Sequence, residues 1–114
     1  MADCLFCKIV AGQIPSAVVY QDDQLFVFRD INPQAPFHVL VVPKRHIATL
    51  NDITPADRDL VGAMVHRAAV LAAEHGYAER GYRTVFNTNA GAGQSVFHIH
   101  LHVLAGRGLT WPPG

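Results

Sequence analysis

Short apolar, β-prone runs bounded by turn-forming residues occupy much of the chain and predict β-strands. A strict alternation of apolar and polar residues marks the last of these runs. Turn-forming residues separate these runs: Asp22 and Asp23 stand between the first two, while Pro33 and Pro36 stiffen the loop before the third. The predicted strands cover residues 18–20, 25–29, 38–42, 82–87 and 96–104.

A longer segment carries the signals of an α-helix. Thr54 is a favoured N-cap residue, and Pro55 suits the first helical position because its missing N–H is not needed there. Gly76 is a stop signal at the other end. Between these limits, apolar residues recur at helical spacing and predict a buried stripe: Leu60, Met64, Ala68 and Leu71.

A shorter helix is predicted near the start, with Asp3 as its cap, Val10 as its last residue and Gly12 as the stop signal beyond it. Five predicted strands and only two helices do not alternate regularly, which argues against a parallel doubly wound sheet. The pattern predicts an α+β fold with a five-stranded antiparallel sheet, one long helix and one short helix.

The composition agrees with a single domain over residues 1–114. Hydrophobic residues make up 50% of the chain, which argues against disorder. Nine basic residues balance nine acidic ones, so a nucleic acid is disfavoured as a partner, whereas a small anionic ligand is not. Without a readable signal peptide or a membrane-length apolar run, we expect a cytoplasmic protein that does not enter a membrane.

Three of the seven histidines, His98, His100 and His102, alternate with apolar residues along the last predicted strand. The two-residue period of a strand places these imidazoles on one face. Neighbouring histidines then stand roughly 6.6 Å apart and the outer two roughly 13 Å, so the outer two are expected to have different roles. The opposite, core-facing positions are Phe97, Ile99, Leu101 and Val103.

A glycine-rich turn stands next to these histidines. Gly91 and Gly93 allow backbone N–H groups to approach an anion closely, and Ser95 adds a hydroxyl donor, which indicates a phosphate site. Two alternatives stay open from the residues alone. The histidines could be ordinary strand residues, or they could ligate a zinc ion that activates a hydrolytic water.

Taken together, three segments resemble the histidine triad superfamily: the His98-x-His100-x-His102 motif, the loop 30–38 and the ending 111–114, which is similar to the Hint branch of histidine triad nucleotide-binding proteins. The resemblance runs from about Cys4 to the last residue. It implies a homodimer whose five-stranded sheets join across the subunits. It also implies hydrolysis of purine nucleoside phosphoramidates through a covalent nucleotidyl-histidine, without a catalytic cofactor.

By this resemblance, His100 would be the nucleophile that attacks the α-phosphorus of the substrate. An imidazole suits this role, since its ordinary pKa of about 6.5 leaves it mostly neutral at pH 7. His102 would contact the phosphate and help to protonate the leaving amine, with Ser95 near the same group. His38 and His98 complete the predicted catalytic set, and His38 would orient His100.

The resemblance also implies a nucleotide pocket. Asp30 would accept hydrogen bonds from the ribose hydroxyls, whereas without the resemblance the residue is interpreted as a turn-forming aspartate before Asn32 and Pro33. Trp111 would reach toward the active site of the partner subunit. The base would lie among Phe6, Phe28 and Ile31, which without the resemblance are ordinary core residues. The phosphate side would be completed by Asn87, Gly93, Gln94 and Ser95.

The two cysteines, Cys4 and Cys7, form a CxxC motif. Spacing alone leaves open half a zinc site, a redox pair or two ordinary thiols, because no second CxxC or compact histidine pair accompanies them. A subset of the histidine triad family has the same motif, and there a zinc ion is completed by two histidines. The resemblance therefore implies a structural zinc on Cys4, Cys7, His46 and His98.

Two other functions stay open at this point. One is a nucleotide-binding interaction protein whose catalysis is incidental. The other is a dinucleoside polyphosphate hydrolase of the Fhit-like branch, although Ser95 and the ending 111–114 favour the Hint branch.

Overall fold

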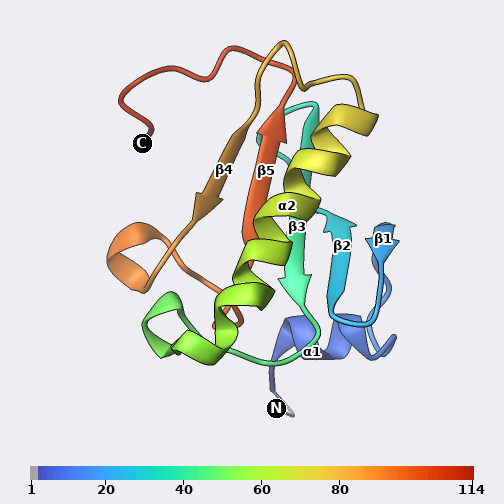
Figure 1. Cartoon of the computed structure of the whole chain (residues 1–114), viewed down its shortest axis with the longest axis vertical. Helices are drawn as coiled ribbons and strands as arrows, with labels where there is room; N and C mark the ends of the chain where they lie inside the picture. Colours follow the sequence, from blue (N-terminus) through green and yellow to red (C-terminus); the bar gives the residue numbers. More distant parts are fainter. Residues whose placement is uncertain (1–2) are drawn as a thin grey trace.

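The computed structural model describes residues 3–114 and contains a five-stranded antiparallel sheet in the order β1-β2-β3-β5-β4. The long helix α2 crosses one face of the sheet, and the short helix α1 lies near the start of β2 and the end of β3 (Figure 1). The predicted α+β fold with an antiparallel sheet is confirmed. The elements are α1 (Leu5–Val10), β1 (Val18–Gln21), β2 (Leu25–Arg29), β3 (Phe37–Pro43), α2 (Arg58–Glu74), β4 (Arg83–Phe86) and β5 (Leu101–Ala105).

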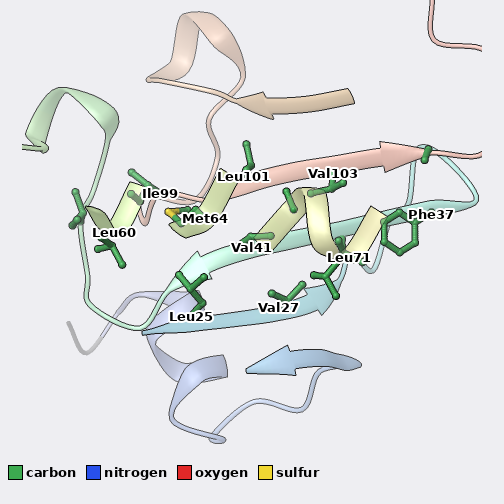
Figure 2. Close-up of a cluster of buried hydrophobic side chains, with 14 residues drawn as sticks. Leu25, Val27, Phe37, Val41, Leu60, Met64, Leu71, Ile99, Leu101 and Val103 are labelled. Atoms are coloured by element: carbon green, nitrogen blue, oxygen red, sulfur yellow. The ribbon is translucent and has the colours of Figure 1, made fainter. Parts of the chain in front are cut away.

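The central strand β3 separates two layers of apolar side chains, and all seven of its residues are buried. Because side chains alternate along a strand, Val39 and Val41 belong to the core under α2, whereas Leu40 and Val42 belong to a second cluster with α1. Figure 2 shows the first of these cores, with Met64 of α2 packed over the sheet.

The α1 face of the sheet is also the histidine face. Leu40 of β3 stands opposite His102 of β5, and residues that stand opposite each other in an antiparallel pair project to the same side. His38 lies two residues before Leu40 and therefore projects to this side as well. The alternation of the sequence thus places two of the predicted catalytic residues on one surface.

The predicted last strand, 96–104, is too long at its start, because β5 begins only at Leu101. The register of β3 and β5 would bring Ile99 opposite Pro43, which has no N–H to offer to the ladder. The N–H of Ile99 instead donates to the carbonyl of Ile47 at 2.7 Å. The chain therefore bends away, and Phe97, predicted to face the core, is 46% exposed.

Two helix starts also differ from prediction. Cys4 rather than Asp3 is the N-cap of α1, and its Sγ accepts the N–H of Cys7 at 3.3 Å. Thr54 caps a 3₁₀ turn, Pro55–Asp57, and α2 follows at Arg58. The remaining predicted strands are confirmed, and their ends shift by no more than one residue. Within residues 3–114, neither helix combines the length and apolar character that crossing a membrane requires.

The predicted helical stripe gives a direct test of the core. Met64 is fully buried in it, whereas its neighbour Val65 is 49% exposed. Replacing Met64 by Ala leaves a cavity and is expected to lower the free energy of unfolding by about 2–5 kcal/mol. The matched substitution Val65→Ala should lower the free energy of unfolding by less than about 0.5 kcal/mol. Urea unfolding of both variants, at one protein concentration, checks this; equal losses would contradict the assigned helix orientation.

Candidate active site

A cavity of about 350 Å³ lies between α1, the end of β2, the middle of β3, and the segment that leads into β5. Sites for small molecules have volumes of roughly 300 to 1,000 Å³. One part of the wall is apolar and is formed mainly by Leu5, Phe6, Ile9, Phe28, Ile31 and Leu40. The other part is polar and is formed by Asp30, Asn87, Gly93, Ser95, His100 and His102.

Most of the predicted site residues therefore meet at one cavity. Ile31 lies at its mouth and is 97% exposed. Four of the predicted catalytic and substrate-binding residues lie outside its walls: His38, His98, Gln94 and Trp111. Leu5, Ile9, Leu40 and Val96 line the cavity and were missed. Of these, Leu40 could have been found from the sequence, because it lies two residues after His38 on the same strand face.

The buried ring of His100 has a defined tautomer. Its Nδ1 lies 2.8 Å from the carbonyl oxygen of His98, and a carbonyl only accepts hydrogen bonds. The ring hydrogen is therefore on Nδ1, and Nε2 keeps a free lone pair. Burial lowers the pKa of His100, although the bond to His98 opposes this shift. His100 consequently presents a neutral, unprotonated nitrogen at pH 7.

A second hydrogen-bond chain gives His102 the opposite tautomer. The backbone N–H of Gln34 donates to Nδ1 of His38 at 3.0 Å, so the ring hydrogen of His38 is on Nε2. That hydrogen is donated to Nδ1 of His102 at 2.9 Å, which leaves the hydrogen of His102 on its own Nε2. Burial, followed by the nearby His100 and His38, lowers the pKa of His102 to about 4.

The two tautomers lie side by side, since the ring centroids of His100 and His102 are 5.0 Å apart. Both residues line the cavity, one with a free lone pair and the other with an N–H. The pair can thus offer a nucleophile and a hydrogen-bond donor to one ligand.

The carboxylate of Asp30 both stabilises its loop by hydrogen bonding and lines the cavity. Its Oδ1 accepts the N–H of Asn32 at 2.8 Å, as expected of a turn-forming aspartate, and its Oδ2 lies 3.5 Å from Nε2 of His38. A carboxylate has about four acceptor sites, so capacity remains for donors of a ligand.

The side chain of Gln94 holds the glycine-rich turn rather than lining the cavity. Its Oε1 accepts the N–H of Asn89 at 2.7 Å, and its Nε2 donates to the carbonyls of Ala48 and Val96 at 2.8 and 3.1 Å. Asn89, at φ 66°, and Gly93, at φ 87°, both adopt positive φ values that most side chains avoid. The hydrogen bonds of Gln94 therefore hold the backbone next to Ser95 in place.

The ending of the chain lies away from this cavity. Arg83 donates from its guanidinium to the carbonyls of Leu109 and Thr110, at 3.4 and 2.9 Å. Trp111 follows and is 82% exposed, and Figure 1 shows the end of the chain on the β4 side of the sheet. Its predicted place at a partner's site stays a prediction.

A separate cluster joins the two cysteines to two histidines. Nδ1 of His98 lies 3.4 Å from Sγ of Cys4 and 3.5 Å from Sγ of Cys7, and Nδ1 of His46 lies 3.4 Å from Sγ of Cys7. The four donor atoms all lie within 4.8 Å of one another. Burial raises the pKa of the Cys7 thiol and lowers that of His98.

The donor set fits a zinc ion. Tetrahedral zinc, with bonds of about 2.3 Å to sulfur and about 2.0–2.1 Å to nitrogen, holds its donor atoms roughly 3.5 Å apart. Nε2 of His98 donates to the carbonyl of Pro43 at 2.7 Å, so its Nδ1 lone pair is directed at the thiols. Asp30, His38 and His102 also lie close together, but the 2.9 Å hydrogen bond between the two histidines occupies the atoms that a metal would need.

The sequence and the fold are both similar to those of known proteins. The family model "Scavenger mRNA decapping enzyme C-term binding" matches residues 3–109. The chain is 55% identical to a HIT family hydrolase from Legionella pneumophila Philadelphia 1, whose crystal structure superposes with a TM-score of 0.97 over 98% of this chain and 100% of that one. It is 46% identical over 112 residues to an uncharacterized HIT-like protein of Synechocystis, covering 98% of this chain and 97% of that protein.

The chain therefore belongs to the histidine triad superfamily and is a histidine triad hydrolase. Within that superfamily it is close to the purine nucleoside phosphoramidase of Escherichia coli K12. The two are 48% identical over 107 residues, which cover 94% of this chain and 90% of that protein.

The lowered pKa of His102 predicts acid-sensitive stability. Its pKa is about 4 in the fold and about 6.5 in an unfolded chain, so the unfolded state binds more protons as the pH falls. This contribution is complete above pH 6.5 and is lost progressively down to about pH 4. The urea midpoint of the wild type should therefore fall between pH 7 and pH 4, and His102→Gln should show a smaller fall. The exposed control His66→Gln should follow the wild type; a His102→Gln curve parallel to the wild type would contradict the prediction.

Proposed function

We propose that the protein hydrolyses purine nucleoside 5′-phosphoramidates, with His100 as the nucleophile. The observation that carries this proposal is the pair of opposite tautomers in one cavity. His100 offers a lone pair because its Nδ1–H is donated to His98, and His102 offers an N–H because its Nδ1 accepts from His38. The 48% identity to the Escherichia coli purine nucleoside phosphoramidase supports the substrate class.

The reaction proceeds in two displacements. Nε2 of His100 attacks the α-phosphorus, a bond forms between nitrogen and phosphorus, and the bond from phosphorus to the leaving amine breaks. The leaving nitrogen takes its proton from a water molecule, and the Nε2–H of His102 donates a hydrogen bond that stabilises the departing nitrogen, with Ser95 on the same wall. Positive charge that develops on the His100 ring is stabilised by the carbonyl of His98, which already accepts its Nδ1–H.

Water completes the cycle. The hydroxide left by this water attacks the phosphorus of the nucleotidyl-histidine, and the bond to His100 breaks, which returns the His100 ring to its neutral form. One water is consumed, and one amine and one nucleoside monophosphate are released. None of these steps requires a metal ion or another catalytic cofactor.

The two parts of the cavity wall match the parts of a nucleotide. The apolar part, with Phe6 and Phe28, suits a purine ring, because flat aromatic surfaces bury a base well. Asp30 retains acceptor capacity for the ribose hydroxyls. Asn87, together with the backbone at Gly93, lies on the polar part and suits the phosphate.

We further propose that the protein acts as a homodimer. β4 is an outer strand of the sheet and pairs only with β5 among the described residues, so its other edge is available for a second copy of β4. The end of the chain lies on the same side of the sheet (Figure 1), and the exposed Trp111 near that end would reach the partner's site. A cytoplasmic location stays a prediction of the sequence.

We also propose that Cys4, Cys7, His46 and His98 hold a structural zinc. The Sγ to Nδ1 distances of 3.4–3.5 Å and the fixed tautomer of His98 support this proposal. When bound, the ion would link α1 to the segment before β5. His98 is therefore assigned to this site and, through its carbonyl, to the orientation of His100.

The nucleophile is tested by hydrolysis of adenosine 5′-phosphoramidate. His100→Ala should lower kcat by roughly 10⁴-fold or more, because no covalent intermediate can form. The variant should still bind AMP, and the control His66→Ala should keep wild-type activity. Turnover by His100→Ala at the wild-type rate would contradict the mechanism. A wild type that binds AMP without hydrolysing the substrate would instead indicate a nucleotide-binding protein.

The zinc proposal is tested by the metal content of the purified protein. After incubation with zinc and gel filtration, the wild type should retain about one equivalent per chain. Cys7→Ser should retain much less, because it removes one of the four donors, whereas His66→Ala should match the wild type. Equal zinc retention by Cys7→Ser and the wild type would contradict the proposed ligand set.

A further inference from the structure

One short helix supplies both the thiols of the metal cluster and a wall of the active-site cavity. The helix α1 has six residues, with Cys4 as its N-cap and Cys7 as its third residue. Phe6 lies between the two cysteines and lines the cavity. Any shift of the cysteines relative to His98 must therefore move Phe6 relative to the cavity.

Such a shift would reach the active site through the contacts of Phe6. Its side chain is buried and meets three rings edge-on. Its ring centroid lies 4.9 Å from that of His100, 5.4 Å from that of Phe28 and 6.0 Å from that of His98. Phe6 thus contacts the proposed nucleophile, the proposed base wall and a proposed metal ligand at the same time.

His98 forms a second connection between the two sites. Its Nδ1 faces both thiols, and its carbonyl oxygen accepts the Nδ1–H of His100 at 2.8 Å. The same residue therefore presents one atom to the metal cluster and another to the ring of the nucleophile. A fixed position of the His98 ring also fixes the backbone to which His100 is bonded.

Without a metal ion, α1 has weak local support. Helices this short are marginal by themselves, and the cap is a sulfur acceptor, 3.3 Å from the N–H of Cys7. The first turn has no acidic residue to favour the helix dipole. The position of α1 therefore depends on the packing of Phe6 and Ile9 and on what holds the two thiols.

We propose that a metal ion bound by Cys4, Cys7, His46 and His98 positions Phe6 against His100, so that nucleoside affinity depends on metal occupancy. The inference rests on the proposed nucleotide function and extends it, since it makes the metal ligands positioning residues for the substrate pocket. Coupling between two sites is reciprocal, so a bound nucleoside must also tighten the metal by the same factor.

The test compares the zinc-loaded protein with the metal-free protein, prepared with a chelator under reducing conditions. Adenosine is the probe, because it lacks the phosphate that would bind zinc in solution. Calorimetry should show adenosine binding about tenfold more tightly to the zinc-loaded form, within the range of roughly 5- to 150-fold that is typical of coupled sites. Saturating adenosine should lower the zinc dissociation constant, measured with a competing chelator, by the same factor.

Hydrogen exchange supplies a readout that does not involve the nucleoside. The amides of Lys8 and Ala11 donate to the carbonyls of Cys4 and Cys7 at 3.1 and 3.0 Å. These amides should exchange more slowly after zinc loading, because the ion ties down the residues whose carbonyls they bond. Amides of α2, such as that of Val65, should not change.

Two variants separate positioning from a general loss of structure. His46 lies outside α1 and outside the nucleotide cavity, so His46→Ala should give the weak adenosine affinity of the metal-free wild type even with zinc present. The control His66→Ala, on the exposed face of α2, should keep the full effect of zinc. Phe6→Ala should bind adenosine weakly and equally in both metal states, because the connection itself is removed.

The outcomes distinguish this inference from the proposals beneath it. Equal adenosine affinity in zinc-loaded and metal-free wild type would overturn the inference while leaving the hydrolase intact. A wild type that takes up no zinc would overturn the inference together with the zinc site. If neither form bound adenosine or AMP, the proposed function would fail, and the inference would fail with it.

Discussion

The site depends on one hydrogen bond, from Nδ1–H of His100 to the carbonyl of His98. A neutral imidazole has a single ring hydrogen, so a carbonyl that accepts it at one nitrogen leaves a lone pair at the other. Burial adds to this by lowering the pKa of His100, which keeps the ring neutral. Tautomer and protonation state are thus set before a substrate arrives, and less reorganisation is needed during the reaction.

Hydrogen bonds that begin at other backbone groups set the tautomers of the neighbouring histidines in the same way. The N–H of Gln34 fixes His38, which in turn fixes His102. The carbonyl of Pro43 fixes His98 with its Nδ1 toward the cysteines. Three imidazoles that look equivalent in the sequence are therefore separated by their backbone partners into a lone-pair donor, a hydrogen donor and a metal-facing ligand.

Much of the fold follows from local patterns in the sequence. Apolar runs bounded by turn-forming residues placed β2 and the centre of β3 correctly, and the stripe of Met64 and its neighbours identified the buried face of α2. The predicted start of β5 was wrong because Pro43, on the neighbouring strand β3, ends the pairing there. The alternation of residues within the last segment contains no information about a residue on another strand. For the same reason Phe97 is exposed, although it is apolar and its position in the alternating pattern predicted that it faces the core.

The residue types of the site were also readable, but their arrangement was not. The distance between the outer histidines correctly indicated that His98 and His102 face different partners. The tautomers rest on backbone groups such as the carbonyl of Pro43, which is 55 residues away from His98 in the chain, and only the fold brings them together. Leu5 and Ile9 were missed in the cavity wall because apolar residues of a binding site rarely differ in sequence from ordinary core.

The tautomer of His100 is the most direct point at which to test this account. Nitrogen-15 NMR of the histidine side chains at pH 7, assigned with His100→Gln, reports which ring nitrogen carries the hydrogen. The account predicts a neutral His100 ring with hydrogen on Nδ1 and a bare Nε2, next to a neutral His102 with hydrogen on Nε2. A His100 ring that is charged, or that carries its hydrogen on Nε2, would contradict it.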